Sequence, residues 1–243
     1  MNPTTDNMKA ALFRLLQELG KEAAYFSLDR VRNHLNQQKV KLTDHVLREY
    51  VSEAMQRGTI HDAGRGWYSA IQLEAVLDQA LAAPLKTLLK KQFPFLPFYV
   101  WTSQQLNPWM HHLLGKSVHF VTAESDGSEE LAEFLAREGW RVLLNPTKSG
   151  RNPALDNQTA VIRGVRREID MEAEPRIETV LIDLALENSR LHLMDEAERQ
   201  EMTRNLVVNN RVEISGMLTR LKNHKLLIEQ FLGVADEPII SEK

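Results

Sequence analysis

The 243-residue sequence contains no cysteine. Its absence excludes disulfides, thiol nucleophiles, iron–sulfur clusters and cysteine-ligated zinc. The sequence also has no run approaching the roughly 20 apolar residues that a transmembrane helix needs. Residues 1–6 lack the basic and then apolar pattern of a signal peptide. We therefore expect a cytoplasmic protein whose core is held together by packing alone.

A strong excess of charge of one sign is also missing, because the formal net charge is only −3. Residues 1–70 carry ten Lys and Arg against eight Asp and Glu, whereas residues 170–243 carry nine against fifteen. The length fits an N-terminal domain of about 70 residues followed by a body of about 150. The two ends of the chain therefore differ electrostatically, although neither has the strongly basic balance of a stand-alone DNA-binding protein.

Three helices are predicted in the first 56 residues. Apolar residues recur at helical spacing over residues 8–19, and Gly20 is expected to end this helix. Ser27 stands at the N-cap position of a second helix, over about 27–37, and Thr43 at that of a third. The third helix has an apolar inner face and a polar outer face, so it is the candidate recognition helix.

Two strand-like runs follow, over residues 59–61 and 67–69. Their connection contains Gly64 and Gly66, which suits a β-hairpin with Arg65 at its tip. Three helices and a hairpin in this order outline a winged helix-turn-helix, which predicts binding of double-stranded DNA. The candidate DNA-binding residues lie on the second helix, the following turn, the third helix and the hairpin tip: Arg30, Arg32, Lys39, Lys41, Thr43, His45, Arg48 and Arg65.

A second interpretation stays open for this N-terminal unit. Winged helices also occur as protein-binding modules in assembly subunits, because a fold does not determine a function. The weak positive charge of residues 1–70 does not decide between them. The alternative to DNA binding is therefore an interaction adaptor that binds a protein partner.

The rest of the chain predicts a connecting helix and then an α/β body. Residues 71–91 are apolar at helical spacing, with a bend expected at Pro84. Strands and a helix alternate after it, which indicates a three-layer α/β core. The expected body elements are strands over 98–101, 117–123, 140–144 and 158–163, helices over 103–112 and 129–138, and a closing helical block over 177–188, 195–208 and 211–232.

The body lacks the complete motifs of two classes of metal-dependent enzyme. A nucleotidyltransferase needs Gly-Ser followed by paired acids on a strand to hold two metal ions. Gly127 and Ser128 are present, but residues 140–144 carry no acid. A nuclease of the restriction-enzyme type needs Glu-x-Lys on the strand after its metal-binding acid, and this motif is missing after Glu124. We expect a protein that is not an enzyme and that uses no cofactor.

Histidines and arginines in the body give two further candidates. His111, His112 and His119 lack carboxylates at ligand spacing, so no metal site is expected. A short basic edge gives a possible secondary contact to DNA, although it can equally pair with Glu168, Asp170 and Glu172. This edge consists of Arg163, Arg166 and Arg167.

Several segments of the body resemble those of a known protein family. Residues 101–112, with Trp101 and Asn107-Pro108-Trp109, the strand over 117–124, residues 142–146 and residues 175–184 together resemble AbiEi-like antitoxins of type IV toxin-antitoxin systems. The resemblance spans about residues 90–240. It departs from the family around residues 124–126, where the family has a longer acidic and hydrophobic strand end.

The resemblance implies a role in phage defence. Such a protein represses its own operon through the winged helix and opposes a nucleotidyltransferase toxin, often without forming a tight complex. Together with the residue patterns, this predicts a winged helix-turn-helix over 1–70, a connecting helix over 71–91 and an α/β antitoxin domain with C-terminal helices over 92–243. The expected function is that of a DNA-binding transcriptional autorepressor and antitoxin.

Overall fold

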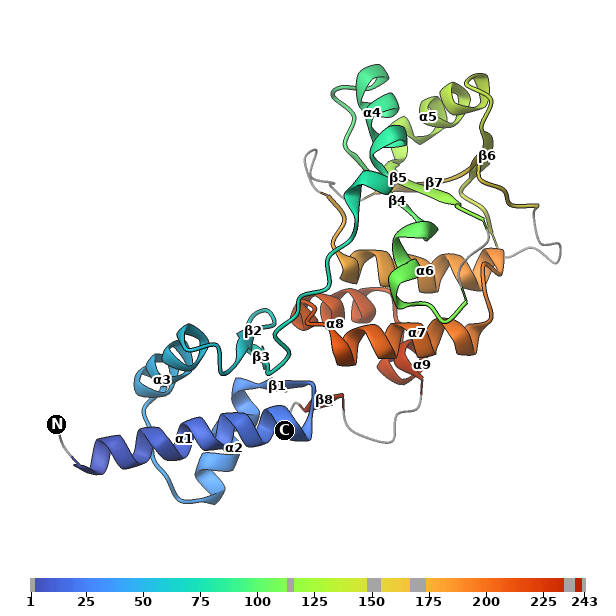
Figure 1. Ribbon diagram of the computed structural model, residues 1–243. Helices are drawn as coiled ribbons and strands as arrows, with labels where there is room; N and C mark the ends of the chain where they lie inside the picture. The colour runs from blue at the N-terminus through green and yellow to red at the C-terminus, as the bar shows by residue number, and fades with distance from the viewer. Residues whose placement is uncertain (1–2, 113–115, 148–153, 167–173, 234–238, 242–243) are drawn as a thin grey trace. The chain divides into compact units, whose positions relative to one another are not determined.

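The computed structural model describes residues 3–112, 116–147, 154–166, 174–233 and 239–241. Helices and strands are mixed along the chain, which confirms the expected α/β class (Figure 1). The chain forms two compact units. Unit 1 combines Met1–Ala75 with Thr203–Lys243, and unit 2 consists of Val76–Met202. The expected domain of residues 92–243 is therefore not one unit, because its last part packs with the N-terminal residues.

Unit 1 begins with the three expected helices, α1 (Pro3–Glu22), α2 (Leu28–Gln37) and α3 (Asp44–Gln56). Ser27 Oγ accepts a hydrogen bond from the amide of Arg30 at 3.0 Å, and Thr43 Oγ1 accepts one from the amide of Val46 at 3.4 Å. Both expected N-caps are confirmed, since each hydroxyl satisfies an amide that the helix itself leaves free. Apolar side chains of all three helices form one buried cluster.

The expected end of the first helix at Gly20 is wrong, because α1 continues to Glu22. Gly20 serves close packing instead. A Cβ atom at this position would lie 2.6 Å from the Cβ of Ala70, so a side chain here would push the two segments apart.

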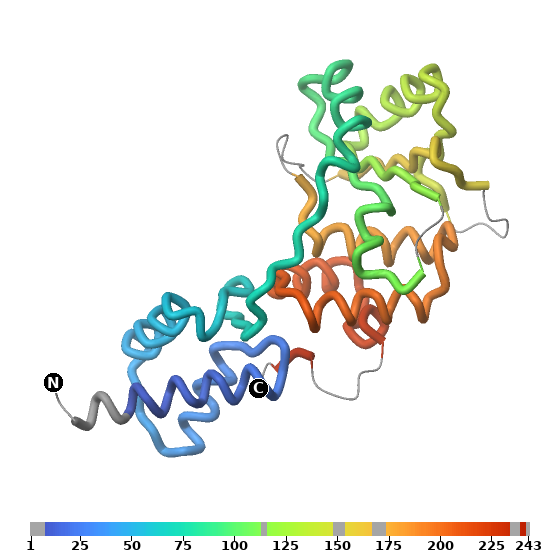
Figure 2. Tube along the Cα trace, in the orientation of Figure 1, coloured from blue at the N-terminus to red at the C-terminus, as the bar shows by residue number. Residues whose placement is uncertain are grey.

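A four-stranded sheet in the order β2-β3-β1-β8 completes unit 1. The expected hairpin is present as β2 (His61–Asp62) and β3 (Trp67–Ser69), which pair antiparallel. Two strands were not predicted. β1 (Tyr25–Ser27) pairs with β3, and β8 (Ile240–Ser241), close to the C-terminus, pairs parallel with β1. Figure 2 shows this last strand, in red, beside the blue N-terminal segment.

The part of unit 1 that follows residue 202 is here called the C-terminal arm. It contains the end of α7 (Glu196–Asn209), then α8 (Ile214–Asn223), α9 (Ile228–Leu232) and β8. The predicted helix over 211–232 is thus two helices, and Lys225 between them has a positive φ of 55°.

The single connecting helix predicted over residues 71–91 is also not present. This segment contains a 3-10 turn, η1 (Gln79–Leu81), and the helix α4 (Ala83–Gln92). Pro84 lies in the first turn of α4, where it is tolerated.

Tyr25 and Arg211 join the arm to the rest of unit 1. The fully buried Tyr25 hydroxyl lies 3.0 Å from the carbonyl of Val207 and 2.9 Å from that of Asn210, and it accepts the amide of Val212 at 3.0 Å. Arg211 donates to the carbonyls of Ile71 and Gln72. The amide of Arg211 also donates to the carbonyl of Leu73 at 2.7 Å. The carbonyl groups of residues 71–73 are thus used by the arm and not by a helix.

Unit 2 is built around a sheet in the order β4-β5-β7-β6. β4 (Phe98–Thr102) pairs antiparallel with β5 (His119–Glu124), while β7 (Thr159–Val165) lies parallel to both β5 and β6 (Arg141–Leu144). A short 3-10 helix, η2 (Ser103–Trp109), follows β4. Its N-cap is Thr102.

Helices cover both faces of this sheet, so the expected three layers are present (Figure 1). Alternate strand residues, such as Val100, Val121 and Ile162, pack with α4 and α5 (Ser125–Arg137) in one buried cluster. The opposite face meets α6 (Ile177–Leu191), where Tyr99 donates to Asp183 at 2.9 Å. Successive residues of a strand point to opposite faces of the sheet, so each strand contributes side chains to the packing against both helical layers.

Arg163 belongs to this second face, where it is paired with an acid other than those that the sequence suggested. Its Nε and Nη2 atoms donate to the carboxylate of Glu187 at 2.6 and 2.8 Å, and Nη2 also donates to the carbonyl of Pro146. The Glu187 side chain is 5% exposed and also accepts from Arg190. Arg166 is exposed directly after β7, and Arg167 lies outside the described residues together with Glu168, Asp170 and Glu172.

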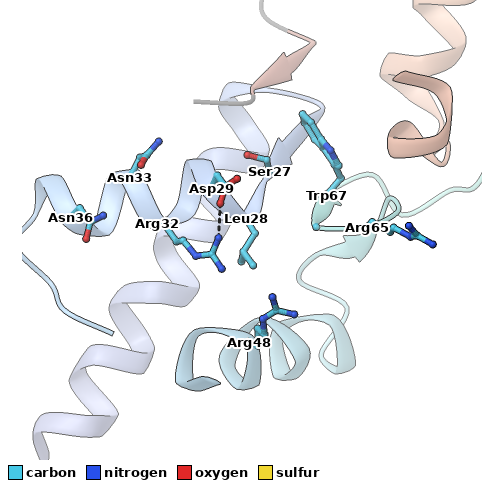
Figure 3. Close-up of a pocket in the computed structure, with 10 residues that line it drawn as sticks. Ser27, Leu28, Asp29, Arg32, Asn33, Asn36, Arg48, Arg65 and Trp67 are labelled. Atoms are coloured by element: carbon cyan, nitrogen blue, oxygen red, sulfur yellow. Dashed lines mark hydrogen bonds and ion pairs between the residues drawn. The ribbon is translucent and has the colours of Figure 1, made fainter. Parts of the chain in front are cut away.

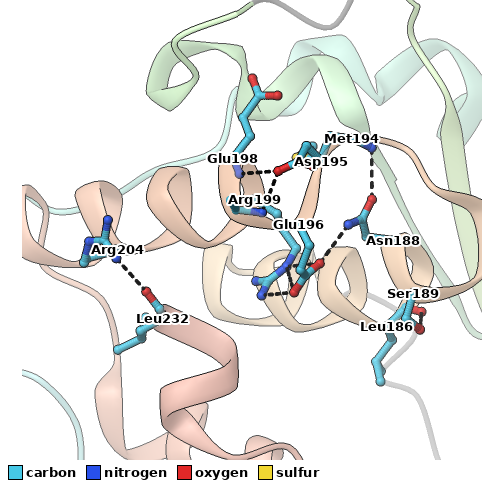
Figure 4. A network of polar contacts seen from close by, with 11 residues as sticks. Leu186, Asn188, Ser189, Met194, Asp195, Glu196, Glu198, Arg199, Arg204 and Leu232 are labelled. Atoms are coloured by element: carbon cyan, nitrogen blue, oxygen red, sulfur yellow. Dashed lines mark hydrogen bonds and ion pairs between the residues drawn. The ribbon is translucent and has the colours of Figure 1, made fainter. Parts of the chain in front are cut away.

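A second polar network links α6 to α7 (Figure 4). Asn188 Nδ2 donates to Glu196 at 2.9 Å, and the Asn188 side-chain oxygen accepts the amide of Met194. Arg199, which is 1% exposed, donates to the same Glu196 carboxylate at 2.7 Å. The turn between the two helices is therefore fixed by side chains on both of them.

Replacing Tyr25 with phenylalanine should lower the free energy of unfolding by about 2 kcal/mol, because the buried amide of Val212 loses its acceptor. Urea denaturation of the full chain measures the change. Tyr50→Phe is the matched control, since Tyr50 is half-buried in the same unit, and it should change the value by less than about 0.5 kcal/mol. Equal effects of the two substitutions would contradict the attachment of the arm through Tyr25.

Glu187→Ala should destabilise unit 2 by about 3 kcal/mol, because Arg163 would lose its anion in a largely buried position. Thermal unfolding followed by circular dichroism provides the measurement. Glu130→Ala is the control, as Glu130 is an exposed acid on α5 of the same unit. An unchanged unfolding midpoint for Glu187→Ala would show that the ion pair is not a structural element.

Candidate functional site

Unit 1 contains a hollow of about 730 Å³ between α2, α3 and the hairpin (Figure 3). It combines cationic, amide and aromatic side chains with a single acid. The lining residues are Ser27, Leu28, Asp29, Arg32, Asn33, Asn36, Arg48, Arg65, Gly66 and Trp67. Side chains from three separate elements therefore meet in one concave surface.

Helix periodicity and one backbone bond position these residues. Asp29, Arg32, Asn33 and Asn36 are spaced by three or four residues on α2, so they share one face of the helix. The hairpin is held next to α2 because the amide of Leu28 donates to the carbonyl of Gly66 at 2.8 Å. This bond fixes the loop that carries Arg65.

The three arginines of the hollow differ in their pairing. Arg32 donates to both oxygens of Asp44 at 3.1 and 3.0 Å and also to Asp29. The hydrogen bond to Asp29 raises the pKa of Arg32 above its ordinary value. Arg48 and Arg65 are exposed, and neither makes an ion pair or hydrogen bond with any residue that the structure describes. Arg32 thus links the N-terminal ends of α2 and α3, while the other two cations remain available to an anion.

Two of the three acids of α3, Asp44 and Glu53, are paired with cations. Asp44 pairs with Arg32, and Glu49 lies 3.6 Å from His45. Glu53 pairs with Lys9 and Arg57, and the hydrogen bond from Lys9 lowers the pKa of its carboxyl below the ordinary value. The nearby Tyr68 hydroxyl has a raised pKa because it is half-buried. Among the described residues, Arg48 and Arg65 are consequently the cations of α3 and the hairpin tip that have no carboxylate partner.

The other candidate residues of the sequence do not line the hollow. Arg30 lies 3.6 Å from Glu22, and Thr43 is used as the N-cap of α3. Lys39 and Lys41 are exposed in the turn between α2 and α3. Of the eight expected positions, the structure thus brings together Arg32, Arg48 and Arg65.

Sequence analysis missed three lining residues that can contact a ligand, Asn33, Asn36 and Trp67. The asparagines follow Asp29 and Arg32 at helical spacing, so the periodicity of α2 was sufficient to find them. Trp67 begins β3, and its position depends on how the hairpin packs against α2. No local signal in the sequence reports that packing.

The histidines of unit 2 occupy separate places. His111 Nε2 lies 3.4 Å from Glu201, whereas His119 contacts the ring of Trp140 edge-on, with 5.1 Å between the ring centres. Burial lowers the pKa of His119. Among the residues that the structure describes, no three His, Asp or Glu side chains come together as metal ligands.

The geometry of the hollow is suited to binding. Guanidinium groups offer several donors to an anion and pair well with phosphate oxygens, while asparagine amides can donate and accept at the edge of a base. The tryptophan adds a flat apolar surface. An extended polyanion is the ligand class that fits cations on two neighbouring elements.

In the described parts of the chain, none of the helices combines the length and the apolar character that crossing a bilayer requires.

Comparison with known proteins identifies one family. No curated protein and no solved structure matches the chain. The model of one family matches residues 46–234, from the first half of α3 through the hairpin and unit 2 to the end of α9. The chain therefore belongs to this family, which is described as a family of unknown function, DUF6577.

Proposed function

We propose that unit 1 is a winged helix-turn-helix that binds double-stranded promoter DNA. In that arrangement α3 enters the major groove and the β2-β3 hairpin, as the wing, meets the phosphate backbone. The observation that carries the proposal is the position of Arg48 and Arg65 around one hollow, where they have no anionic partner among the described residues. DNA supplies phosphates and acceptor-rich base edges to such groups.

The lining of the hollow favours DNA over the alternative, a protein-binding adaptor. An acidic protein surface also suits Arg48 and Arg65, which have no carboxylate partner among the described residues. Asn33 and Asn36 beside them suit base edges or phosphates. If the full chain binds a protein partner but does not bind duplex DNA, the result supports the adaptor.

We further propose that the protein represses its own operon and acts as an antitoxin against a nucleotidyltransferase toxin, in the cytoplasm. This part rests on the resemblance to AbiEi-like antitoxins, whose segments over 101–112, 117–124 and 142–146 all lie in unit 2. Under this proposal, unit 1 sets expression and unit 2 opposes the toxin.

Arg48→Ala and Arg65→Ala should each weaken binding to the chain's own promoter by about 1–3 kcal/mol if the arginine contacts a base, and by less if it contacts a phosphate. Fluorescence anisotropy at several salt concentrations separates the two cases, because losing a phosphate contact reduces the salt dependence. Arg14→Ala, an exposed arginine on α1 away from the hollow, is the matched control. If all three variants bind like the parent protein, α3 is not the recognition helix.

Co-expression tests the antitoxin role. The full chain, expressed from an unrelated promoter, should restore growth to cells that express the proposed nucleotidyltransferase toxin. A variant with both Arg48→Ala and Arg65→Ala should restore growth equally, because binding to DNA is then not needed for its expression. Failure of the parent chain would refute the antitoxin role, and failure of the double variant alone would place antitoxicity in unit 1.

A further inference from the structure

We propose that the C-terminal arm sets the position of Arg65 at the hairpin tip, with Glu213 and Ser215 as positioning residues. The inference rests on the proposed function, because it concerns how the DNA-binding arginine is held. It goes further in assigning a role in that site to residues at the start of α8, far away in the sequence. The loop of residues 63–66 is one of the places where the two parts of unit 1 meet.

The hairpin loop is anchored on both sides of Arg65. After the arginine, the carbonyl of Gly66 accepts the amide of Leu28 at 2.8 Å. Before it, the carbonyl of Ala63 accepts the amide of Ser215 at 3.3 Å. Within the loop, the amide of Trp67 donates to the carbonyl of Gly64 at 2.8 Å. A tip that is tied to α2 and to α8 loses little further conformational freedom when Arg65 binds, which favours affinity.

The carboxylate of Glu213 organises the side of the loop that faces α8. It caps α8 by accepting the amide of Gly216 at 3.0 Å, and it also accepts the hydroxyl of Ser215. A Cβ atom on Gly64 would overlap the Glu213 carboxylate and the Ser215 hydroxyl, and one on Gly216 would overlap the same carboxylate. The loop therefore approaches the start of α8 so closely at Gly64 that a side chain there would displace Glu213 and Ser215.

The arm can act as a fixed support because other bonds hold it in place. Tyr25 binds the backbone of residues 207–212, Arg211 binds that of residues 71 and 72, and β8 pairs with β1. The first turn of α8 follows these attachments directly. A change at Glu213 should therefore reach Arg65 through the loop, without any contact between the arm and DNA.

Gly64→Ala in the full chain tests the inference. The new methyl group would overlap the side chains of Glu213 and Ser215, so the contact between the loop and α8 has to change. We expect the dissociation constant for a labelled duplex of the chain's own promoter to rise about five- to 100-fold. The matched control is Gly139→Ala. Gly139 has a similar positive φ, 86° against 99° at Gly64, but a Cβ there would meet no atom within 4 Å, and it lies in unit 2. Gly139→Ala therefore has the same cost of a positive φ at a residue other than glycine, but its methyl group displaces no neighbouring atom.

Two readouts separate positioning from a general loss of stability. In an Arg65→Ala background, Gly64→Ala should have little further effect on the affinity, because both changes remove the same contact. Amide hydrogen exchange in residues 64–67 should rise in Gly64→Ala and stay unchanged in Gly139→Ala. Glu213→Ala provides a second variant from the side of the arm. Glu213→Ala should also weaken binding to the duplex, and it replaces Gly64→Ala as the test if that variant does not fold.

The outcomes are distinguishable. Weakened binding that is not additive with Arg65→Ala, with faster exchange in the loop, supports the inference. An effect of Gly64→Ala and Glu213→Ala no larger than that of Gly139→Ala, or full additivity with Arg65→Ala, overturns it. If the parent chain binds neither its promoter nor a random duplex of equal length, the proposed function fails. The exchange measurement then still decides whether the arm holds the loop.

Discussion

The buried hydroxyl of Tyr25 is the interaction on which the rest of unit 1 depends. It contacts backbone groups of Val207, Asn210 and Val212, at the point where α7 ends and the chain turns into α8. These groups need partners, because an unpaired polar group costs free energy in a site that water does not reach. Once they are satisfied, the start of α8 has a defined place against the hairpin loop. The position of Arg65 then follows from the contact between α8 and the hairpin loop.

Charge pairing defines the candidate site as much as its shape does. Arg32 and Arg163 both resembled DNA contacts in the sequence, yet each is engaged by carboxylates, of Asp29 and Asp44 in one case and of Glu187 in the other. A cation held in this way binds a new anion only by giving up its present partner. Arg48 and Arg65 face no such exchange within the described part of the chain, which makes them the stronger candidates.

Local structure was largely predictable from the sequence, and pairing between distant segments was not. The N-caps Ser27 and Thr43 act within three residues, so their signals suffice. Residues 71–91 have helical periodicity, but Arg211 takes the carbonyl groups of Ile71 and Gln72, and the helix does not form there. The pairing of β8 with β1 joins two very short strands from opposite ends of the chain. Such short segments carry too little pattern to reveal their partner.

The order of the segments has a consequence for folding and for any division of the chain. Unit 1 is formed by both ends of the sequence, and unit 2 is inserted between them. During synthesis, Tyr25 and the hairpin loop emerge long before the groups that they bind in the arm. The hollow can therefore reach its final form only after the residues of unit 2 have been synthesised. A fragment that ends between the units lacks the support of the hairpin, so weak DNA binding by residues 1–91 would report a missing arm as well as the intrinsic affinity of α3.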